Sequence, residues 1–283
     1  MTLAPLAYWV HDLNPFLIRF TDKIGIRYYG LAYVLGFVVA AWMCVRYARK
    51  GRSAVPAAKV NDLMMALIIG VLVGGRLGHY FLYDDWKSFP TDPFGVFKVW
   101  DGGMAFHGGL VGVMIALIWF SRANKIPFFH VSDVIASVTP VGLFFGRIAN
   151  FINGELWGKV SHVPWAMIFP LSAPPGTPIS MIPPRHPSQL YEAGMEGILL
   201  FAYMQWRFWK TPVVERSPGR LTGEFLVAYA IARSIGEVFR EPDYGISPIM
   251  GLSRGTFYSL FMIVGGFGVI IYTMLKEERS RKS

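Results

Sequence analysis

Long apolar stretches separated by short polar segments dominate the chain. A helix that crosses the hydrocarbon core of a bilayer needs roughly 20 mostly apolar residues, and several stretches reach that length. The pattern predicts about seven membrane-spanning helices, near residues 28–46, 62–83, 102–121, 131–152, 189–209, 222–240 and 255–275. The stretches 189–209 and 222–240 carry several Glu and Arg residues, so six or eight spans are the alternative counts.

The composition agrees with a protein that is solvated by lipid. Of the 283 residues, 53% are hydrophobic and only 16% are charged, whereas soluble domains carry about a quarter of charged residues. Mean hydropathy is +0.41. A soluble protein with an unusually apolar core is the alternative, but the length of the apolar stretches disfavours it. We therefore expect an all-α integral membrane protein.

The distribution of Lys and Arg sets the expected orientation. The net charge is +9 and the pI is about 9.7, which in a soluble protein would suggest nucleic-acid binding. Here the basic residues gather after the first, third and fifth predicted spans and in the C-terminal tail. Because cytoplasmic loops hold the excess of Lys and Arg, we expect the N-terminus outside, the C-terminus in the cytoplasm and no nucleic-acid partner.

Residues 153–188 form the longest predicted outer segment, and this segment is rich in proline. Proline disrupts helices, so we expect a small extracytoplasmic lid or head attached to a single polytopic domain over 1–283. The N-terminus lacks the pattern of a removable signal peptide. The single cysteine, Cys44, lies in an apolar stretch, so we expect an inert core residue and no internal disulfide.

Ionisable and polar residues recur at similar depths in the outer halves of the spans. An ionisable residue inside a membrane is costly and indicates function by default. Arginine pairs with phosphate through two parallel hydrogen bonds, so these residues together predict a site for an anionic lipid headgroup at the outer leaflet. Snorkelling arginines or structural ion pairs are the alternatives, and Arg233 and Glu237 have the i, i+4 spacing of a local pair. The residues at this depth are Tyr29, Arg76, His107, Arg147, Gln189, Glu192 and Arg233.

The segment GRIANFINGELWG, residues 146–158, is the strongest local motif. In a helix, Arg147 and Asn150 share a face, and the Asn153-Gly154 pair predicts the helix end. Glu155 then follows on the loop that enters the outer segment. A simple helix cap followed by an interfacial tryptophan is the alternative interpretation.

Two further motifs carry candidate site residues. In VWDGGMAFHGGL (99–110), paired glycines flank His107, which suggests a close approach of backbone at that histidine. In RHPSQLYE (185–192), Gln189 lies where the chain re-enters the membrane. A satisfied structural histidine and a proline-led helix start are the respective alternatives.

Together these motifs resemble the prolipoprotein diacylglyceryl transferases, bacterial inner-membrane enzymes of lipoprotein maturation. The resemblance covers most of the chain in the family's order. It implies transfer of the diacylglyceryl group from phosphatidylglycerol to the lipobox cysteine of a preprolipoprotein signal peptide. It also implies a multi-pass protein with its site at the outer leaflet and no cofactor, and we expect a monomer. The remaining matching segments are RYYGL (27–31), GGRLGHYFLY (74–83) and ARSIGEVFREPD (232–243).

The resemblance and the residue chemistry together assign roles. Arg147 and Arg233 are expected to bind the phosphate and His107 to accept the thiol proton, although the phosphate or a carboxylate is an alternative acceptor. Glu237 is expected to orient Arg233. No His/Asp/Glu cluster has the spacing of metal ligands, so no metal is expected. A lipid transporter and a non-catalytic assembly protein are the rival interpretations. The residues expected to organise the headgroup are Tyr29, Arg76, Asn150, Asn153, Glu155 and Gln189.

Overall fold

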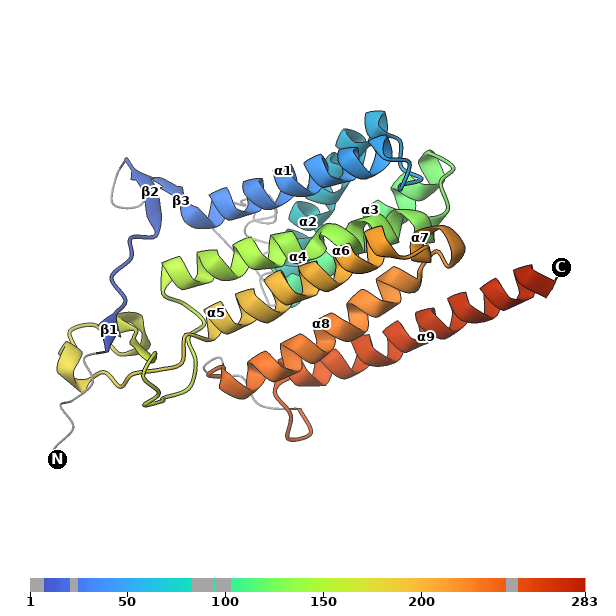
Figure 1. The fold of residues 1–283 in the computed structure, drawn as a ribbon. Coiled ribbons are helices and arrows are strands. Elements are labelled where there is room, and N and C mark those ends of the chain that lie inside the picture. Colours follow the sequence, from blue (N-terminus) through green and yellow to red (C-terminus); the bar gives the residue numbers. More distant parts are fainter. Residues whose placement is uncertain (1–7, 21–24, 83–93, 95–102, 243–248, 283) are drawn as a thin grey trace. The chain divides into compact units, whose positions relative to one another are not determined.

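A computed structural model describes residues 8–20, 25–82, 94, 103–242 and 249–282, and this part of the chain is mostly helical (Figure 1). The ends of three motifs, at residues 83, 99–102 and 243, lie outside the described residues. The α-helices are α1 (Tyr28–Arg49), α2 (Val60–Leu82), α3 (Phe106–Ala123), α4 (Phe128–Asn153), α5 (Ser188–Glu192), α6 (Leu200–Lys210), α7 (Val213–Arg216), α8 (Arg220–Phe239) and α9 (Arg254–Lys282). The described part of the chain also holds four short strands: β1 (Trp9–Val10), β2 (Phe16–Arg19), β3 (Gly25–Arg27) and β4 (Met167–Ile168).

The chain packs as two units, one of residues 41–134 and the other of residues 1–40 with 135–283. The first unit contains α2 and α3, which pack against each other along a row of glycines. A Cβ added at Gly70 would lie 2.6 Å from the Gly112 carbonyl oxygen, and one at Gly78 would lie 2.6 Å from the Gly108 Cα. The two backbones are therefore in direct contact, as is common where helices associate in lipid.

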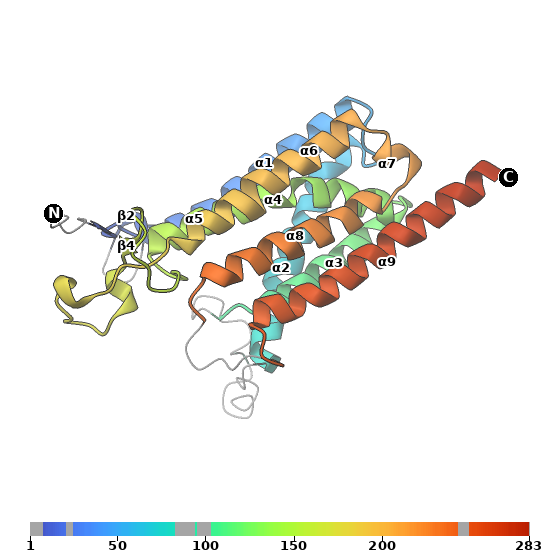
Figure 2. The ribbon, with the colours of Figure 1, turned by 60° about the horizontal axis from the view of Figure 1, so that its bottom comes forward.

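In the second unit, α8 and α9 lie side by side, as both views show (Figures 1 and 2). A Cβ at Gly223 of α8 would lie 2.7 Å from the Gly266 carbonyl oxygen of α9. Helices α5 and α6 form one continuous helical run through a π-helix, η7 (Ala193–Leu199). A Cβ at Gly197 of η7 would lie 2.7 Å from the Cβ of Phe144, so this run packs closely against α4.

The segment between α4 and α5 contains β4 and two 3₁₀ turns, η5 (Pro170–Ser172) and η6 (Ile179–Met181). Strand β4 pairs in parallel with β1 near the start of the described chain, with Trp9 opposite Met167. Strands β2 and β3 form an antiparallel hairpin that leads directly into α1. Residues 154–187 therefore form an irregular lobe, which residues 9–10 extend.

Among the described residues, four helices are long and apolar enough to cross a membrane: Tyr28–Arg49, Ala57–Phe81, Phe128–Asn153 and Arg254–Ser280. Helix α3 is apolar but shorter. The predicted spans 189–209 and 222–240 correspond to the run α5–η7–α6 and to α8. The helical membrane character is thus confirmed, whereas the count of seven and the orientation stay predictions.

Candidate active site

Arg147 lies on the last two turns of α4 and faces the run α5–η7–α6. Its Nε and Nη2 atoms donate hydrogen bonds of 3.0 and 2.9 Å to Oε2 of Glu196, and its Nη1 lies 2.9 Å from Oε2 of Glu192. The two carboxylates are four residues apart, so they share one face of their helix. One guanidinium group therefore bridges both of them.

Arg233 on α8 reaches the same carboxylates from a third helix. Its Nη1 donates a 2.5 Å hydrogen bond to Oε1 of Glu192 and lies 3.9 Å from Oε1 of Glu196. Its Nη2 pairs with Glu237 at the i, i+4 position of α8, which confirms the local pair that the spacing predicts. Glu192 therefore joins the arginines of α4 and α8, and Arg240 lies 3.9 Å from the same oxygen of Glu192.

We call these six residues the arginine–glutamate cluster: Arg147, Glu192, Glu196, Arg233, Glu237 and Arg240. Glu192 and Glu196 are fully buried, and the side chains of Arg147 and Arg233 are 14% exposed. Unpaired charges buried in this way are strongly destabilising, so the three positive and three negative groups must stabilise one another. The exposed part of the cluster belongs to its arginines and Glu237, not to the central carboxylates.

The π-helix η7 brings Glu196 into this cluster. Its hydrogen bonds run from residue i to i+5, which widens the helix and shifts the side chains relative to an α-helix. The Oε1 atom of Glu196 is buried without a hydrogen-bond partner among the described residues. Short π-helical segments are frequent at functional sites, and here the segment carries one of the two central carboxylates.

A second cluster of polar side chains lies at the end of α4 and in the loop that follows it, a few residues after Arg147 in the sequence. Helix α4 ends at Asn153, as the Asn-Gly pair predicts, and Gly154 has φ +65°. The carboxylate Oε1 of Glu155 accepts hydrogen bonds from the amides of Asn150 (2.7 Å) and Asn153 (3.3 Å). Gln189 of α5 donates a 2.6 Å hydrogen bond to the Glu155 backbone carbonyl. Four predicted site residues are thus brought together.

Gln189 is fully buried, and its Oε1 has no hydrogen-bond partner among the described residues. The preceding residue, Ser188, donates a 2.9 Å hydrogen bond to the Leu156 carbonyl. Leu156 itself adopts φ +58°, an unusual conformation for a residue other than glycine. The loop is therefore held in a defined, strained shape against the start of α5.

The same loop is joined to the end of α8. The Lys159 N–H donates to the Phe239 carbonyl at 2.8 Å, and the Glu241 N–H donates to the Trp157 carbonyl at 3.2 Å. Arg185 Nη1 lies 3.1 Å from the Glu241 carboxylate. These links fix the loop after Arg147 to the helix that carries Arg233.

His186 of the lobe packs against Tyr191 of α5. The Nδ1 atom of His186 lies 3.1 Å from the Tyr191 hydroxyl, and the two rings pack edge to face. Partial burial lowers the pKa of His186 below its usual value. His186 is therefore neutral at pH 7 and serves as a packing group beside Tyr191.

The sequence did not single out His11, which the structure places against the α4 motif. Its Nε2 lies 2.6 Å from the Phe151 carbonyl oxygen, and its ring stacks on Phe169. A Cβ at Gly154 would lie 2.9 Å from the same ring. No signal in the sequence links His11 to residue 151, because the contact joins distant parts of the chain.

In the sequence, Glu192 was counted among the polar residues at the depth of the predicted site, whereas Glu196 was only one of the charges within an uncertain span. Their i, i+4 spacing on a predicted membrane helix is the signal that could have assigned them to the site. Tyr29, in the same unit, packs edge to face on Tyr33 with ring centroids 5.3 Å apart. Its predicted role at the arginine–glutamate cluster stays a prediction.

Arg76 and His107 belong to the unit of residues 41–134. Arg76 is buried on α2, and its Nη1 donates a 3.3 Å hydrogen bond to the Gly103 carbonyl. His107 is exposed on the first turn of α3. Within the described residues, no group of three or more His, Cys, Asp or Glu side chains has the arrangement of a metal site.

Comparison with known proteins identifies the family. Residues 15–272 match the family model described as prolipoprotein diacylglyceryl transferase. Similar curated proteins carry the name phosphatidylglycerol–prolipoprotein diacylglyceryl transferase. The protein of Vibrio vulnificus is 44% identical over 250 residues, which is 88% of either chain. That of Zymomonas mobilis is 41% identical over 279 residues, which is 97% of this chain and 92% of the relative. That of Photorhabdus laumondii is 44% identical and covers 88% of this chain and 89% of its own.

Proposed function

Because the chain belongs to the prolipoprotein diacylglyceryl transferase family, we propose that it transfers the diacylglyceryl group of phosphatidylglycerol to the lipobox cysteine of a prolipoprotein. The observation that carries the mechanism is the bridge that buried Glu192 makes between Arg147 and Arg233. Two guanidinium groups from different helices are held close together by it. Such a pair of forked donors suits a phosphodiester.

The reaction forms a thioether and breaks a carbon–oxygen bond. The cysteine sulfur attacks the glycerol carbon that bears the phosphate, and the C–O bond electrons leave with the phosphate as glycerol phosphate. The thiol proton passes to a base. Since negative charge grows on the leaving phosphate in the transition state, donors fixed around that phosphate lower the barrier.

Arg147 and Arg233 are proposed to supply those donors. Glu192, Glu196 and Glu237 hold the two guanidinium groups in place before the lipid arrives, so little reorganisation is needed. The arginine side chains keep 14% of their surface exposed, whereas Glu192 and Glu196 keep none. The arginines are therefore the members that a lipid phosphate can reach.

His107 is the proposed base for the thiol. A free cysteine has a pKa of about 8.5 and must lose its proton to become a strong nucleophile. Imidazole accepts protons near neutral pH, and the exposed position of His107 on the first turn of α3 allows contact with a second substrate. The alternative acceptors are the leaving phosphate and a carboxylate of the site.

The remaining predicted residues are proposed to organise the headgroup and its surroundings. The hydrogen bonds of Glu155 with two asparagines and with Gln189 support this role for the loop after α4. Glu237 orients Arg233 through their ion pair. The proposed headgroup residues are Tyr29, Arg76, Asn150, Asn153, Glu155 and Gln189.

We further propose seven spans, with an outer N-terminus, a cytoplasmic C-terminus and the site facing the outer leaflet of the bacterial inner membrane. The four helices of spanning length and apolarity support four of the spans. The helices α3, α5–η7–α6 and α8 supply the other three. In the last two, the charges pair with one another, which lowers the cost of placing them in lipid. We propose that the protein acts as a monomer.

The test is transfer by the purified protein in detergent. Phosphatidylglycerol labelled in its diacylglyceryl part is mixed with a lipobox peptide, and peptide mass and glycerol phosphate release are measured. We expect the peptide to gain mass in wild type and neither product in Arg147→Ala. Loss in His107→Ala with normal folding supports the base, whereas retained transfer in that variant removes this role and favours the alternative acceptors.

Two outcomes would favour the rival functions. Lipid binding by wild type without mass gain of the peptide points to a lipid transporter. An Arg147→Ala protein that fails to accumulate, beside an inactive wild type, points to a structural role in assembly. Abundance and the unfolding temperature are measured on each preparation so that lost activity is distinguished from lost fold.

A further inference from the structure

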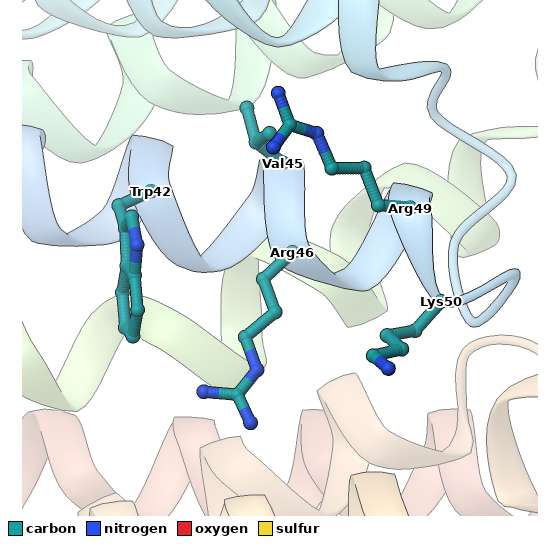
Figure 3. Close-up of a pocket in the computed structure, with 5 residues that line it drawn as sticks. All are labelled: Trp42, Val45, Arg46, Arg49 and Lys50. Atoms are coloured by element: carbon teal, nitrogen blue, oxygen red, sulfur yellow. The ribbon is translucent and has the colours of Figure 1, made fainter.

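A hollow of about 200 Å³ lies beside the C-terminal half of α1, and none of the residues proposed for transfer lines it. Its lining consists of Trp42, Val45, Arg46 and Arg49 of α1 and of Lys50, which directly follows the helix (Figure 3). Trp42, Arg46 and Lys50 project to the same side of α1 in this view. We call this the α1 groove. Pockets that enclose drug-sized ligands hold roughly 300–1,000 Å³, so this hollow suits a small polar group.

The groove combines three cationic groups with one aromatic ring. Trp42 is 60% exposed, and the Arg46 Cζ lies 5.7 Å from the centroid of its ring. None of the five lining residues is acidic. Tryptophan favours the headgroup level of a bilayer, and adjacent Lys and Arg attract anionic lipids there. The chemistry of the groove is therefore complementary to a phosphate at a membrane surface.

An apolar ridge on α1 leads into the groove. Val34, Val38 and Trp42 follow one another at four-residue spacing and are 57%, 59% and 60% exposed. Arg46 and Lys50 continue the same spacing, so one i, i+4 row changes from apolar to cationic at Trp42. A phospholipid has the same order, with acyl chains followed by a charged headgroup.

Helix length places the groove far from the predicted headgroup site at the start of α1. Arg46 is 17 positions after Tyr29, which corresponds to roughly 25 Å along the helix axis. Since the hydrocarbon core is about 30 Å thick, the two positions belong to opposite leaflets. A lipid in the α1 groove is therefore not the lipid that would react near Tyr29.

Basic residues at a helix C-terminus also have two simpler effects. They complement the negative end of the helix dipole, and they favour the cytoplasmic side of the membrane. Neither effect requires an exposed Trp42 between an apolar ridge and the cations, nor a hollow at that position. We propose that the α1 groove binds the phosphate of an anionic phospholipid in the leaflet that the C-terminal end of α1 reaches.

The test measures contact between Trp42 and lipids of defined headgroup. The full chain is reconstituted in vesicles that contain brominated phosphatidylglycerol or brominated phosphatidylcholine, whose bromine atoms quench nearby tryptophans. The same measurement on Trp42→Phe is subtracted, so that only the Trp42 signal remains. We expect an apparent preference of about tenfold or more for phosphatidylglycerol at Trp42.

A matched pair of variants tests the role of the cations. Arg46→Gln combined with Lys50→Gln leaves Arg49 in place, so the orientation signal after α1 is only reduced. The control, Lys276→Gln combined with Arg279→Gln, removes the same charge from exposed positions of α9. We expect the preference at Trp42 to fall about tenfold in the first pair and to be unchanged in the second.

Three outcomes overturn the proposal. Equal quenching by both headgroups in wild type shows that Trp42 merely faces bulk lipid. An equal fall of the preference in both double variants assigns it to overall charge. Displacement of the lipid by excess inorganic phosphate assigns the groove to a soluble anion. Quenching that persists in excess phosphate and is lost only in the α1 double variant supports the proposal.

Discussion

Two ionic groups lie along α8, and they differ in how their carboxylates are held. Near the start of α8, Glu224 accepts 2.6 and 2.5 Å hydrogen bonds from Nε and Nη2 of Arg207 on α6. Near its end, Arg233 shares the buried Glu192 with Arg147 of α4. In the first group, one arginine and one glutamate pair through two hydrogen bonds, and Arg220 forms a further ion pair with Glu224, four residues later on α8. The second links three helical elements through a shared acid.

This difference separates a structural pair from a site. Both carboxylate oxygens of Glu224 accept hydrogen bonds from the guanidinium group of Arg207, as expected of a contact that joins two helices. In the arginine–glutamate cluster, two fully buried carboxylates are divided between arginines that remain partly exposed, and one oxygen of Glu196 has no hydrogen-bond partner among the described residues. The acids are fixed there, while the cations face outward. We infer that the number of ion pairs matters less than which partner stays accessible.

The largest expected effect is the loss of transfer in Arg233→Ala. Removing one donor that stabilises charge in a transition state costs about a hundredfold to a thousandfold in rate. Arg207→Ala is the matched control, because it removes an arginine from the other group on the same pair of helical elements. We expect its transfer rate to stay within a few-fold of wild type. Similar losses of transfer in the two variants would remove the distinction between the groups.

The next effect concerns stability. Glu196→Gln keeps the size of a fully buried side chain but leaves Arg147 short of a counter-charge, and we expect a loss of about 3 kcal/mol. Glu224 is 11% exposed, so its pair with Arg207 is less desolvated, and we expect Glu224→Gln to lose about 1 kcal/mol. Unfolding in detergent, followed by circular dichroism over a denaturant series, measures both. The comparison fails if Glu224→Gln is the more damaging change.

A glycine pair in the π-helix provides a test of its geometry. A Cβ at Gly197 would lie 2.7 Å from the Cβ of Phe144, whereas one at Gly194 would meet no atom within 4 Å. We expect Gly197→Ala to destabilise the protein by about 1–3 kcal/mol and to lower transfer, because it displaces η7 and with it Glu196. Gly194→Ala should change neither property. Equal results for the two variants would mean that the packing of η7 on α4 does not position the acid.

The smallest effect is expected at the ion pair that joins Arg185 of the lobe to Glu241 after α8. Glu241 is 43% exposed and lies 3.1 Å from Arg185, so neutralising it should cost less than about 1 kcal/mol. The loss should shrink further as salt is added, since exposed charges are screened. Unfolding of Glu241→Gln at low and high salt measures this. A large loss of stability that does not depend on salt would show that the exposure of an ion pair does not predict how much the pair stabilises the protein.

The sequence predicted individual site residues better than their partners. Arg147 and Arg233 followed from the cost of charge in membrane spans, and the local pair of Arg233 with Glu237 followed from i, i+4 spacing. The contacts of Glu192 with both arginines did not follow, because they depend on how three helical elements meet. The π-helix was also not predicted, since its hydrogen-bond pattern has no clear sequence signal.

The same limit applies to the fold. Four spans were recognisable because length and apolarity suffice for them. The runs 189–209 and 222–240 were less certain, since their charges argue against a membrane until their pairing is known. That pairing, of Arg207 with Glu224 and of Arg233 with Glu192, is tertiary and not visible in local sequence. The contact of His11 with the Phe151 carbonyl is long-range in the same sense.

The parallel pairing of β1 with β4 also sets an order of events during synthesis. Trp9 pairs opposite Met167, so the strand made first has no partner until about 160 further residues have been translated. At roughly 5–20 residues per second, this takes on the order of 10–30 s. During that interval the first strand must stay unpaired while several helices enter the bilayer. The lobe is therefore completed only after α1 to α4 have been made, although its first strand precedes all of them in the chain.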